Sequence, residues 1–214
     1  MEKIELKKVQ PHVFRGRDLA QSNIWGNEVS FKKEKFYLIE ANSGTGKSSL
    51  CSFLYGYRND YEGDILFDNE NAGLFPISRW VELRKHHIAL LWQELRLFPE
   101  LTAWENIQIK NKMTGFQTDL QIAQWFDMLG IGDKRDALIG RMSYGQQQRV
   151  ALIRTLCQPA DFILADDPIS HLDEQNSRLM ADLLTQEAKR QGAGVITTSI
   201  GKRLELNYDT TYTL

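Results

Sequence analysis

The sequence predicts an α/β fold, a class in which strands and helices alternate along the chain. Two observations lead to this prediction. Short apolar runs of strand length recur between longer segments whose apolar residues have helical spacing. In addition, a glycine-rich loop at 41–49 lies between one apolar run and one helical pattern. The 214 residues are enough for one full core, so we expect a single domain over 1–214.

The first half of the chain alternates strand-like and helical patterns. Residues 35–41 (KFYLIEA) form an apolar run with charge before it and Ser-Gly after it, which is typical of a buried strand. Residues 46–57 carry apolar side chains at helical spacing up to the last residue. Runs at 64–69 and 87–92 predict two further strands, with a helix at 78–86 between them.

The second half begins with a mostly helical stretch from 102 to about 138, whose clearest segments are 102–113 and 118–130. The patterns after it predict a helix at 144–157, a strand at 161–166, a helix at 173–192 closed by Gly192, a strand at 193–199, and last strands near Leu204 and at 210–214.

Composition excludes several classes of function. The net charge of -2 gives no reason to expect a nucleic-acid partner. No apolar run approaches the roughly 20 residues that span a bilayer, and the N-terminus lacks the apolar core of a signal peptide. Cys51 and Cys157 lie in patterns of buried helix and are expected to be free thiols. These features together favour a cytoplasmic protein.

The stretch ANSGTGKSS predicts a phosphate-binding loop between a strand and a helix. Gly44 and Gly46 allow backbone N–H groups to close around an anion that the helix dipole also favours. Lys47 would reach the β- and γ-phosphates, and the Ser48 hydroxyl would hold Mg²⁺. The alternative is a plain glycine-rich turn. The expected nucleotide-binding residues are Asn42, Ser43, Gly44, Thr45, Gly46, Lys47, Ser48 and Ser49.

The loop departs from the pattern G-x-x-x-x-G-K-[ST] at its first position, which is Ala41. A phosphate loop also needs a carboxylate on a neighbouring strand for the Mg²⁺ shell. The run FILADD supplies Asp166 at the end of a predicted strand, although a strand followed by an acidic turn would look the same. The two motifs together indicate the core fold of P-loop nucleotide hydrolases.

The stretch MSYGQQQRVALIRTL resembles the signature of ATP-binding-cassette (ABC) ATPases, usually written LSGGQ, with matches at Ser143, Gly145 and Gln146. The order of motifs fits as well, because Gln93 follows a strand and SHLD at 170–173 resembles the D-loop of the family. The pattern WQELRLFPELTAWENI is most similar to the small ATPases of lipoprotein export, macrolide export and cell division.

This resemblance implies a fold, partners and site residues. The fold is a P-loop core with a mixed central sheet, an N-terminal antiparallel β subdomain and a helical subdomain inserted at about 94–145. Phe14, or alternatively Trp25, would stack on adenine, and Gln93 would contact Mg²⁺ and the attacking water. The signature of one chain faces the ATP of another, so two cassettes form a head-to-tail dimer. The resemblance also implies an integral membrane permease subunit as a partner. Bound to it, the protein would lie in the cytoplasm at the inner face of the cell membrane.

Three departures from the family affect hydrolysis. Asp167 replaces the usual Glu that orients the attacking water, and it is shorter by about 1.5 Å, a misplacement that can lower a rate about 100-fold. The histidine expected after the last core strand is absent, and Ser199 takes its place. Tyr144 replaces a signature Gly, where its side chain either crowds the partner's phosphate or packs sideways. We therefore expect ATP binding with slow hydrolysis.

Three functions stay open from the sequence. The chain is an ATPase subunit of a transport or envelope complex, an ATP-gated regulatory module with little turnover, or the degenerate half of a mixed cassette pair. The basic run RKHH at 84–87 is expected to be a solvated helix end. The aromatic residues Trp92, Phe98 and Trp104 border the groove where cassettes of this family receive a membrane partner, and some of them are expected to form a docking patch.

Overall fold

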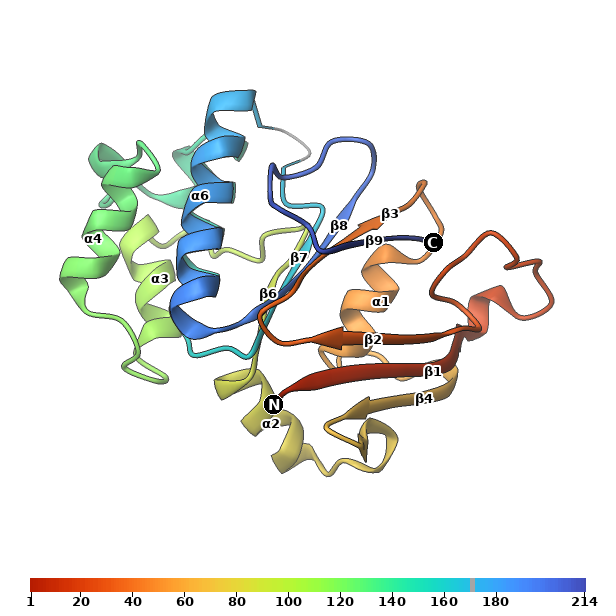
Figure 1. Ribbon diagram of the computed structural model, residues 1–214. Coiled ribbons are helices and arrows are strands. Elements are labelled where there is room, and N and C mark those ends of the chain that lie inside the picture. Colours follow the sequence, from red (N-terminus) through yellow and green to blue (C-terminus); the bar gives the residue numbers. More distant parts are fainter. Residues whose placement is uncertain (170–171) are drawn as a thin grey trace.

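The computed structural model describes residues 1–169 and 172–214. Strands form two sheets, and helices pack on both sides of the larger sheet (Figure 1). The predicted α/β class is confirmed. Two residues of the expected D-loop, Ser170 and His171, lie outside the described residues.

The smaller sheet is antiparallel, with strand order β2-β1-β4-β5. Its strands are β1 (Lys3–Pro11), β2 (Glu28–Lys32), β4 (Tyr61–Phe67) and β5 (Glu70–Asn71). Asp68 and Asn69 have φ values of 49° and 76°, so they form a two-residue hairpin turn that joins β4 to β5. The prediction of a strand over 64–69 is therefore wrong at its end, because these two residues reverse the chain.

The larger sheet is parallel, with strand order β6-β7-β8-β3-β9. Its strands are β3 (Phe36–Glu40), β6 (Ile88–Leu91), β7 (Phe162–Asp166), β8 (Gly194–Ser199) and β9 (Thr210–Thr213). Because all five strands run the same way, their carboxyl ends meet at one edge (Figure 1). Ligands of open parallel sheets bind at this edge, and the loop that follows β3 starts there.

The helices begin and end where side-chain caps and glycines place their limits. Thr102 and Ser143 each form a capping box, with Glu105 and Gln146 respectively. The prediction that Gly192 closes the long helix is confirmed by its left-handed conformation. The α-helices are α1 (Lys47–Leu54), α2 (Ile77–His86), α3 (Ala103–Asn111), α4 (Asp119–Met128), α5 (Tyr144–Leu156) and α6 (Glu174–Gln191), and 3₁₀ turns lie at His12–Phe14, Ala72–Leu74, Gly132–Lys134 and Ile139–Arg141.

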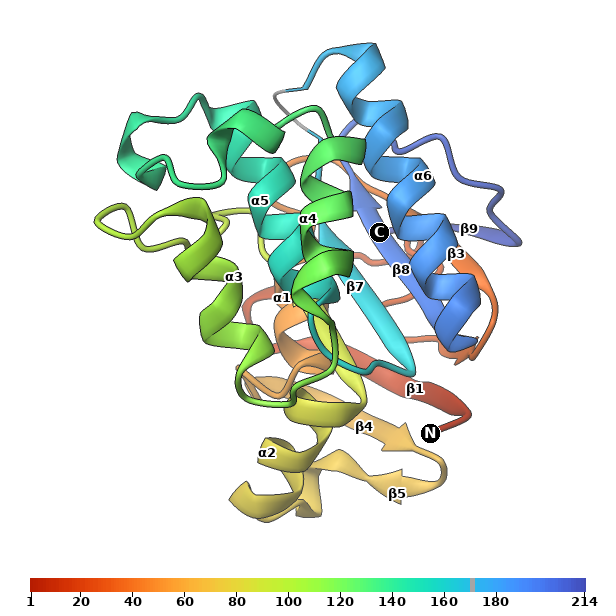
Figure 2. The same cartoon turned by 90° about the vertical axis from the view of Figure 1, so that its left-hand side faces the viewer.

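Two hydrophobic clusters cover opposite faces of the parallel sheet. On β7, Ile163 belongs to the cluster with α5 and α6, whereas its neighbour Leu164 belongs to the cluster with α1 and the antiparallel sheet. Val195 and Ile196 alternate in the same way on β8. The sheet thus separates a helical layer, in which α3, α4 and α5 lie together, from the antiparallel sheet (Figure 2).

Two predicted elements differ from the structure. No strand forms near Leu204 among the described residues, because 201–208 is irregular even though Leu204 and Leu206 are buried at alternate positions. The helix predicted for 46–57 ends at Leu54, since Gly56 adopts a left-handed conformation and leaves Tyr57 59% exposed. The apolar pattern thus marked buried residues in both segments, but it did not give the backbone conformation.

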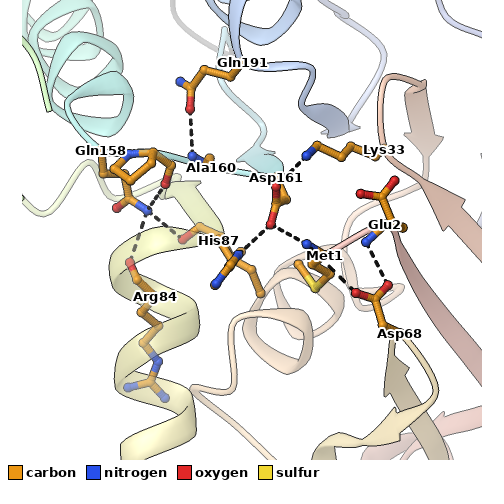
Figure 3. Close-up of polar contacts among 12 residues, drawn as sticks. Met1, Glu2, Lys33, Asp68, Arg84, His87, Gln158, Ala160, Asp161 and Gln191 are labelled. Atoms are coloured by element: carbon orange, nitrogen blue, oxygen red, sulfur yellow. Dashed lines mark hydrogen bonds and ion pairs between the residues drawn. The ribbon is translucent and has the colours of Figure 1, made fainter.

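Asp161 joins both sheets just before β7 (Figure 3). Its carboxylate accepts hydrogen bonds from the Met1 ammonium at 2.8 Å and from the Lys33 ammonium at 2.8 Å, and His87 Nδ1 lies 2.5 Å from it. Burial alone would raise the pKa of Asp161, but these hydrogen bonds outweigh it and hold the pKa below its ordinary value. The expectation of a solvated helix end at 84–87 is thus wrong for His87, and also for Arg84, which packs on aromatic rings.

Candidate functional site

The loop between β3 and α1 has the backbone that anion binding requires. Gly44 and Gly46 have φ values of 80° and 102°, in the region where L side chains are strained. A Cβ atom on Gly46 would lie 2.9 Å from the Phe14 ring and 3.1 Å from the Trp25 ring. Only glycine therefore fits at this position, and the loop leads directly into the N-terminus of α1.

Lys47 is the first residue of α1 and is only 7% exposed. Its ammonium donates to the Asn42 carbonyl at 2.9 Å and to the Ala41 carbonyl at 3.4 Å. Burial lowers the pKa of Lys47, and the nearby carboxylates of Asp167 and Asp166 oppose that effect. The loop thus places a buried cation next to backbone N–H groups that are suited to bind an anion.

A cavity of about 300 Å³ brings most of the predicted phosphate-binding residues together. Gln93 lines it although it lies far from the loop in sequence. Two lining residues, Val13 and Ile200, were not anticipated, because neither carries a chemical group that points to phosphate. The lining consists of Val13, Phe14, Ser43, Gly44, Gly46, Lys47, Ser48, Ser49, Gln93 and Ile200.

A second cavity of about 400 Å³ adjoins the first and shares Phe14 and Gly44 with it. Trp25 donates its indole N–H to the Thr45 carbonyl at 2.9 Å, so it helps to hold the backbone of the loop in place. The Arg17 guanidinium lies 5.2 Å from the centre of the Phe14 ring. Phe14 is therefore the aromatic residue that borders both cavities, which fits a base and its phosphates.

The two adjacent acids Asp166 and Asp167 are both buried, at the end of β7 and directly after it. Thr198 on β8 donates its hydroxyl to Asp166 at 2.7 Å and accepts the Asp167 N–H at 3.1 Å. Asp167 has a φ of 45°, so the chain turns sharply between the two carboxylates. Sequence reasoning missed Thr198, although its position opposite Asp166 follows from the parallel register.

Ser199 is not among the residues that line the phosphate cavity. It is 2% exposed, and its hydroxyl donates to the Lys202 carbonyl. The next residue, Ile200, lines the cavity instead with an apolar side chain. The structure thus offers no imidazole and no hydroxyl from this strand end to a phosphate among the residues it describes.

The signature residues lie at the N-terminus of α5, away from the phosphate cavity of the same chain. Ser143 caps the helix by accepting the Gln146 N–H at 3.3 Å, and Gln146 Oε1 accepts the Ser143 N–H at 3.0 Å. Gly145 packs on Leu172, since a Cβ there would lie 3.0 Å from it. Asp173, the other described residue of the expected D-loop, caps α6 through the Asn176 N–H at 2.8 Å.

Tyr144 packs sideways onto the loop that carries Gln93. Its hydroxyl donates to the Gln93 carbonyl at 3.0 Å, a contact between residues 51 positions apart. This is the second of the two orientations that the sequence left open. The helical layer and the phosphate cavity are therefore connected through a side chain that the family pattern does not contain.

Arg154, at the other end of α5, holds the same loop. Leu95 and Arg96 adopt left-handed conformations with φ values of 60° and 51°. Arg154 donates to the Leu95 carbonyl at 2.5 Å and to the Arg96 carbonyl at 2.7 Å. Burial lowers the pKa of Arg154 to about 10, so these carbonyls compensate a largely buried cation.

The donor set suits magnesium bound together with phosphates. The Ser48 hydroxyl, the Asp166 carboxylate and the Gln93 side chain offer the oxygen ligands that Mg²⁺ prefers. Within residues 1–169 and 172–214, no group of three or more His, Cys, Asp or Glu side chains could hold a metal alone. No described helix is long and apolar enough to cross a membrane.

Comparisons with known proteins agree with this geometry. The family model described as ABC transporter matches residues 26–170, more than half of the chain. An uncharacterized ABC transporter ATP-binding protein, YclH of Bacillus subtilis (strain 168), is 34% identical over 169 residues, which cover 75% of this chain and 74% of YclH. The dimeric structure of MJ0796, a bacterial ABC transporter cassette, matches with a TM-score of 0.77 at 25% identity and covers 92% of this chain and 87% of the cassette.

Another structure of MJ0796 matches the fold equally well. It is the dimeric post-hydrolysis state bound to ADP and Pi, with a TM-score of 0.77, 23% identity, and coverage of 92% of this chain and 87% of that chain.

Proposed function

The chain belongs to the ABC transporter family, and from this premise we propose that it is the ATP-binding subunit of an ABC transporter or envelope complex. It is an ATPase of the ABC class. The subunit binds Mg-ATP, dimerises head-to-tail and drives a separate integral membrane permease from the cytoplasmic face of the membrane. Hydrolysis within the dimer is slow.

The proposed nucleotide site uses the phosphate loop and its surroundings. The N–H groups at 42–49 and the Lys47 ammonium bind the phosphates. This is supported by a cavity of about 300 Å³ that six of these eight residues line and by the burial of the Lys47 side chain. Phe14 stacks on adenine at the border of the second cavity. Ser48, Asp166 and Gln93 hold Mg²⁺, which supplies charge neutralisation of the phosphate oxygens when bound.

The proposed dimer follows from the separation of two motifs in one chain. Ser143, Gly145 and Gln146 form an anion-binding helix N-terminus that does not line the cavity of their own phosphate loop. We propose that they contact the γ-phosphate held by a second cassette, which is a copy of this chain or a different one. The helices between about 94 and 145 would move with the signature as one subdomain.

The burial of Ser199 carries the proposal of slow hydrolysis. Its hydroxyl is used by Lys202, and an apolar side chain takes the place beside the phosphates. Asp167 orients the attacking water with a side chain one methylene shorter than the family residue. Tyr144 packs sideways and ties the signature helix to the loop of Gln93, the residue proposed to contact the attacking water. Each departure affects the transition state, whereas the groups that bind the ground state are intact.

The binding part of the proposal is tested by calorimetry with Mg-ATP. Wild type should bind, and Lys47→Ala should lose binding because the buried cation is removed. Lys85→Ala is the matched control. It replaces a lysine of α2 that does not line the cavity, so this variant should bind as wild type does. Equal affinity of wild type and Lys47→Ala would contradict the proposed site.

A second function has support from the same departures. The chain could act as an ATP-gated regulatory module, or as the degenerate half of a mixed cassette pair. In a mixed pair, Asp167 and Ser199 would weaken the site on this chain's own ATP, and Tyr144 would affect the partner's ATP. Co-purification from native membranes separates the cases, because only the mixed pair brings down a different cassette with a permease.

The surface for the membrane subunit is proposed near the Gln93 loop. Phe98 is 50% exposed and Tyr57 is 59% exposed, whereas Trp92 is partly buried between Tyr55 and Tyr57. Exposed aromatic side chains of this kind are typical of protein docking sites. Because this surface lies at the C-terminal end of α1, it is one short helix away from the phosphate loop.

A further inference from the structure

The cavity of about 400 Å³ beside the phosphate loop is lined by two aromatic residues, but both are buried. Phe14 is 6% exposed and Trp25 is 2% exposed. Both rings lie against the backbone of Gly46, where a Cβ atom would be 2.9 Å from Phe14 and 3.1 Å from Trp25. A nucleobase that enters this cavity therefore finds little aromatic surface on which to stack.

A tight turn places the Arg17 side chain over the Phe14 ring. The Arg17 N–H donates to the Phe14 carbonyl at 3.0 Å. Between them, Arg15 has a φ of -54° and a ψ of 129°, and Gly16 has a φ of 74°. These angles are those of a type II turn, which needs a positive φ at its third residue. The turn brings the Arg17 guanidinium to 5.2 Å from the ring centre, so an exposed planar cation lies over a buried ring.

The Arg17 guanidinium is available to a ligand. Among residues 1–169 and 172–214, no carboxylate lies within 4.0 Å of it. The adjacent Asp18 carboxylate instead accepts the Ala20 N–H at 2.9 Å. By contrast, Arg15 is paired with Glu62 at 2.7 Å. Since Arg17 lines the cavity together with two residues of the phosphate loop, its guanidinium lies where a base would continue from bound phosphates.

We propose that Arg17 is the residue that contacts the nucleobase of bound ATP. The base stacks on the plane of the guanidinium, and the Phe14 ring supports the guanidinium from its other side. Guanidinium planes stack on bases and on aromatic rings, and a ring face attracts a cation. This inference rests on the proposed function, because it assumes that the cavity receives the base of ATP. It gives Arg17 the direct contact with the base that the proposed function gives to Phe14.

Stacking on Arg17 has a consequence for nucleotide specificity. The contact uses the π face that every nucleobase has, so it adds affinity without selecting one base. Binding of Mg-GTP should therefore depend on Arg17 as binding of Mg-ATP does. Binding of Mg-tripolyphosphate, which has the phosphates but no base, should not depend on Arg17.

Calorimetry of Arg17 variants with these ligands tests the contact. Arg17→Ala should weaken the binding of Mg-ATP and of Mg-GTP about tenfold or more, as the loss of a stacking side chain does. Its affinity for Mg-tripolyphosphate should stay within about twofold of wild type, because the phosphate loop is unchanged. Arg17→Lys keeps the charge but lacks the plane, so it should lose nearly as much ATP affinity as Arg17→Ala. Circular dichroism checks that each variant is folded.

Arg15→Ala is the matched control. Arg15 lies two residues before Arg17 and is also exposed, but it is paired with Glu62 and lines neither the base cavity nor the phosphate cavity. This variant should bind Mg-ATP, Mg-GTP and Mg-tripolyphosphate as wild type does.

Chemical modification of the wild-type chain tests the same contact without a variant, so it holds even if Arg17→Ala folds poorly. Phenylglyoxal reacts with accessible guanidinium groups, and mass spectrometry of the peptides measures the reaction at each arginine. Saturating Mg-ATP should protect Arg17 from modification, whereas saturating Mg-tripolyphosphate should not. Modification of Arg15 should proceed at one rate with either ligand and without ligand.

The outcomes separate the inference from the proposed function. An ATP affinity that Arg17→Ala leaves unchanged, or Arg17 modification that Mg-ATP does not slow, overturns the inference. Equal losses of ATP and tripolyphosphate affinity in folded Arg17→Ala, or full rescue by Arg17→Lys, would mean that Arg17 binds a phosphate, and this also overturns it. The proposed function stands in each of these cases. A wild-type chain that binds neither Mg-ATP nor Mg-tripolyphosphate overturns both.

Discussion

Asp167 directly follows β7 and Ser199 is the last residue of the neighbouring strand β8. If the short carboxylate alone limited turnover, Asp167→Glu would be enough to raise it. We expect less than about a threefold gain from this change, because polarised water without a phosphate contact receives only part of the stabilisation. Ser199→His supplies the missing contact, and the double variant should gain more than the sum of both in log rate.

The measurement is steady-state phosphate release by wild type, both single variants and the double variant. Ser199→Ala is the control, because an imidazole at position 199 must also open the contact between Ser199 and Lys202. A gain in Ser199→Ala would mean that opening this turn, not the imidazole, accelerates the reaction. Strictly additive changes would show that the two positions act on different steps.

Single residues also show where prediction from sequence stops. Lys47, Ser48 and Asp166 could be proposed from the sequence, because a phosphate loop and the acid that serves it have a known residue pattern. Thr198 could not, since a threonine at the end of a strand has no signature until the register places it opposite Asp166. The side-chain direction of Tyr144 was likewise open, because it depends on a loop 51 residues away.

At the scale of elements, α5 controls the position of Gln93 through Tyr144 and Arg154. Tyr144→Phe removes only the hydroxyl that binds the Gln93 carbonyl. We expect the affinity for Mg-ATP to stay within about twofold, because the phosphate loop is untouched, and kcat to change by about threefold or more, because a hydrogen bond is worth about 0.5–1.5 kcal/mol. Parallel calorimetry and phosphate-release assays test this difference.

Tyr57→Phe is the control for this experiment, since it removes a hydroxyl from another exposed tyrosine near the loop without a contact to Gln93. It should change neither quantity. A Tyr144→Phe variant that loses ATP affinity and kcat in equal proportion would indicate a purely structural role. An unchanged kcat would contradict the role of the Tyr144 hydroxyl in positioning Gln93.

Most strands and helices follow from periodicity, whereas their ends do not. The turn at Asp68–Asn69 looked like strand because only the backbone conformation distinguishes it. Leu204 and Leu206 alternate with polar residues as a strand would, yet they are buried in an irregular segment. Such alternation predicts that one face of a segment is buried. It does not show whether the segment pairs with a neighbouring strand, which a β-strand also requires.

At the scale of the whole molecule, Asp161 ties the antiparallel sheet to the parallel one. Asp161→Asn should lower the free energy of unfolding at pH 7 by about 1–3 kcal/mol, because the ammonium groups of Met1 and Lys33 lose their partner. The pKa of Asp161 is depressed in the folded state. Its contribution is therefore fully present above the unfolded pKa of about 3.9 and is lost as pH falls through the lower folded value.

Urea unfolding of both proteins between pH 7 and pH 3.5 tests this prediction. The difference between wild type and Asp161→Asn should be constant down to about pH 5 and should shrink below about pH 4. Asp133→Asn is the control, because the Asp133 carboxylate is also paired, with Lys134, but is 70% exposed. Its effect should stay within about 0.5 kcal/mol. A difference that grows toward low pH would contradict the role of Asp161.

The central claim is that this cassette binds Mg-ATP through an intact site but hydrolyses it slowly. Steady-state phosphate release by the isolated wild-type chain at saturating Mg-ATP tests it most directly, with Lys47→Ala as the baseline. The account predicts a rate above that baseline and well below about 1 s⁻¹, the low end of usual enzymes. A wild-type rate of about 1 s⁻¹ or faster, or one equal to the Lys47→Ala baseline, would contradict it.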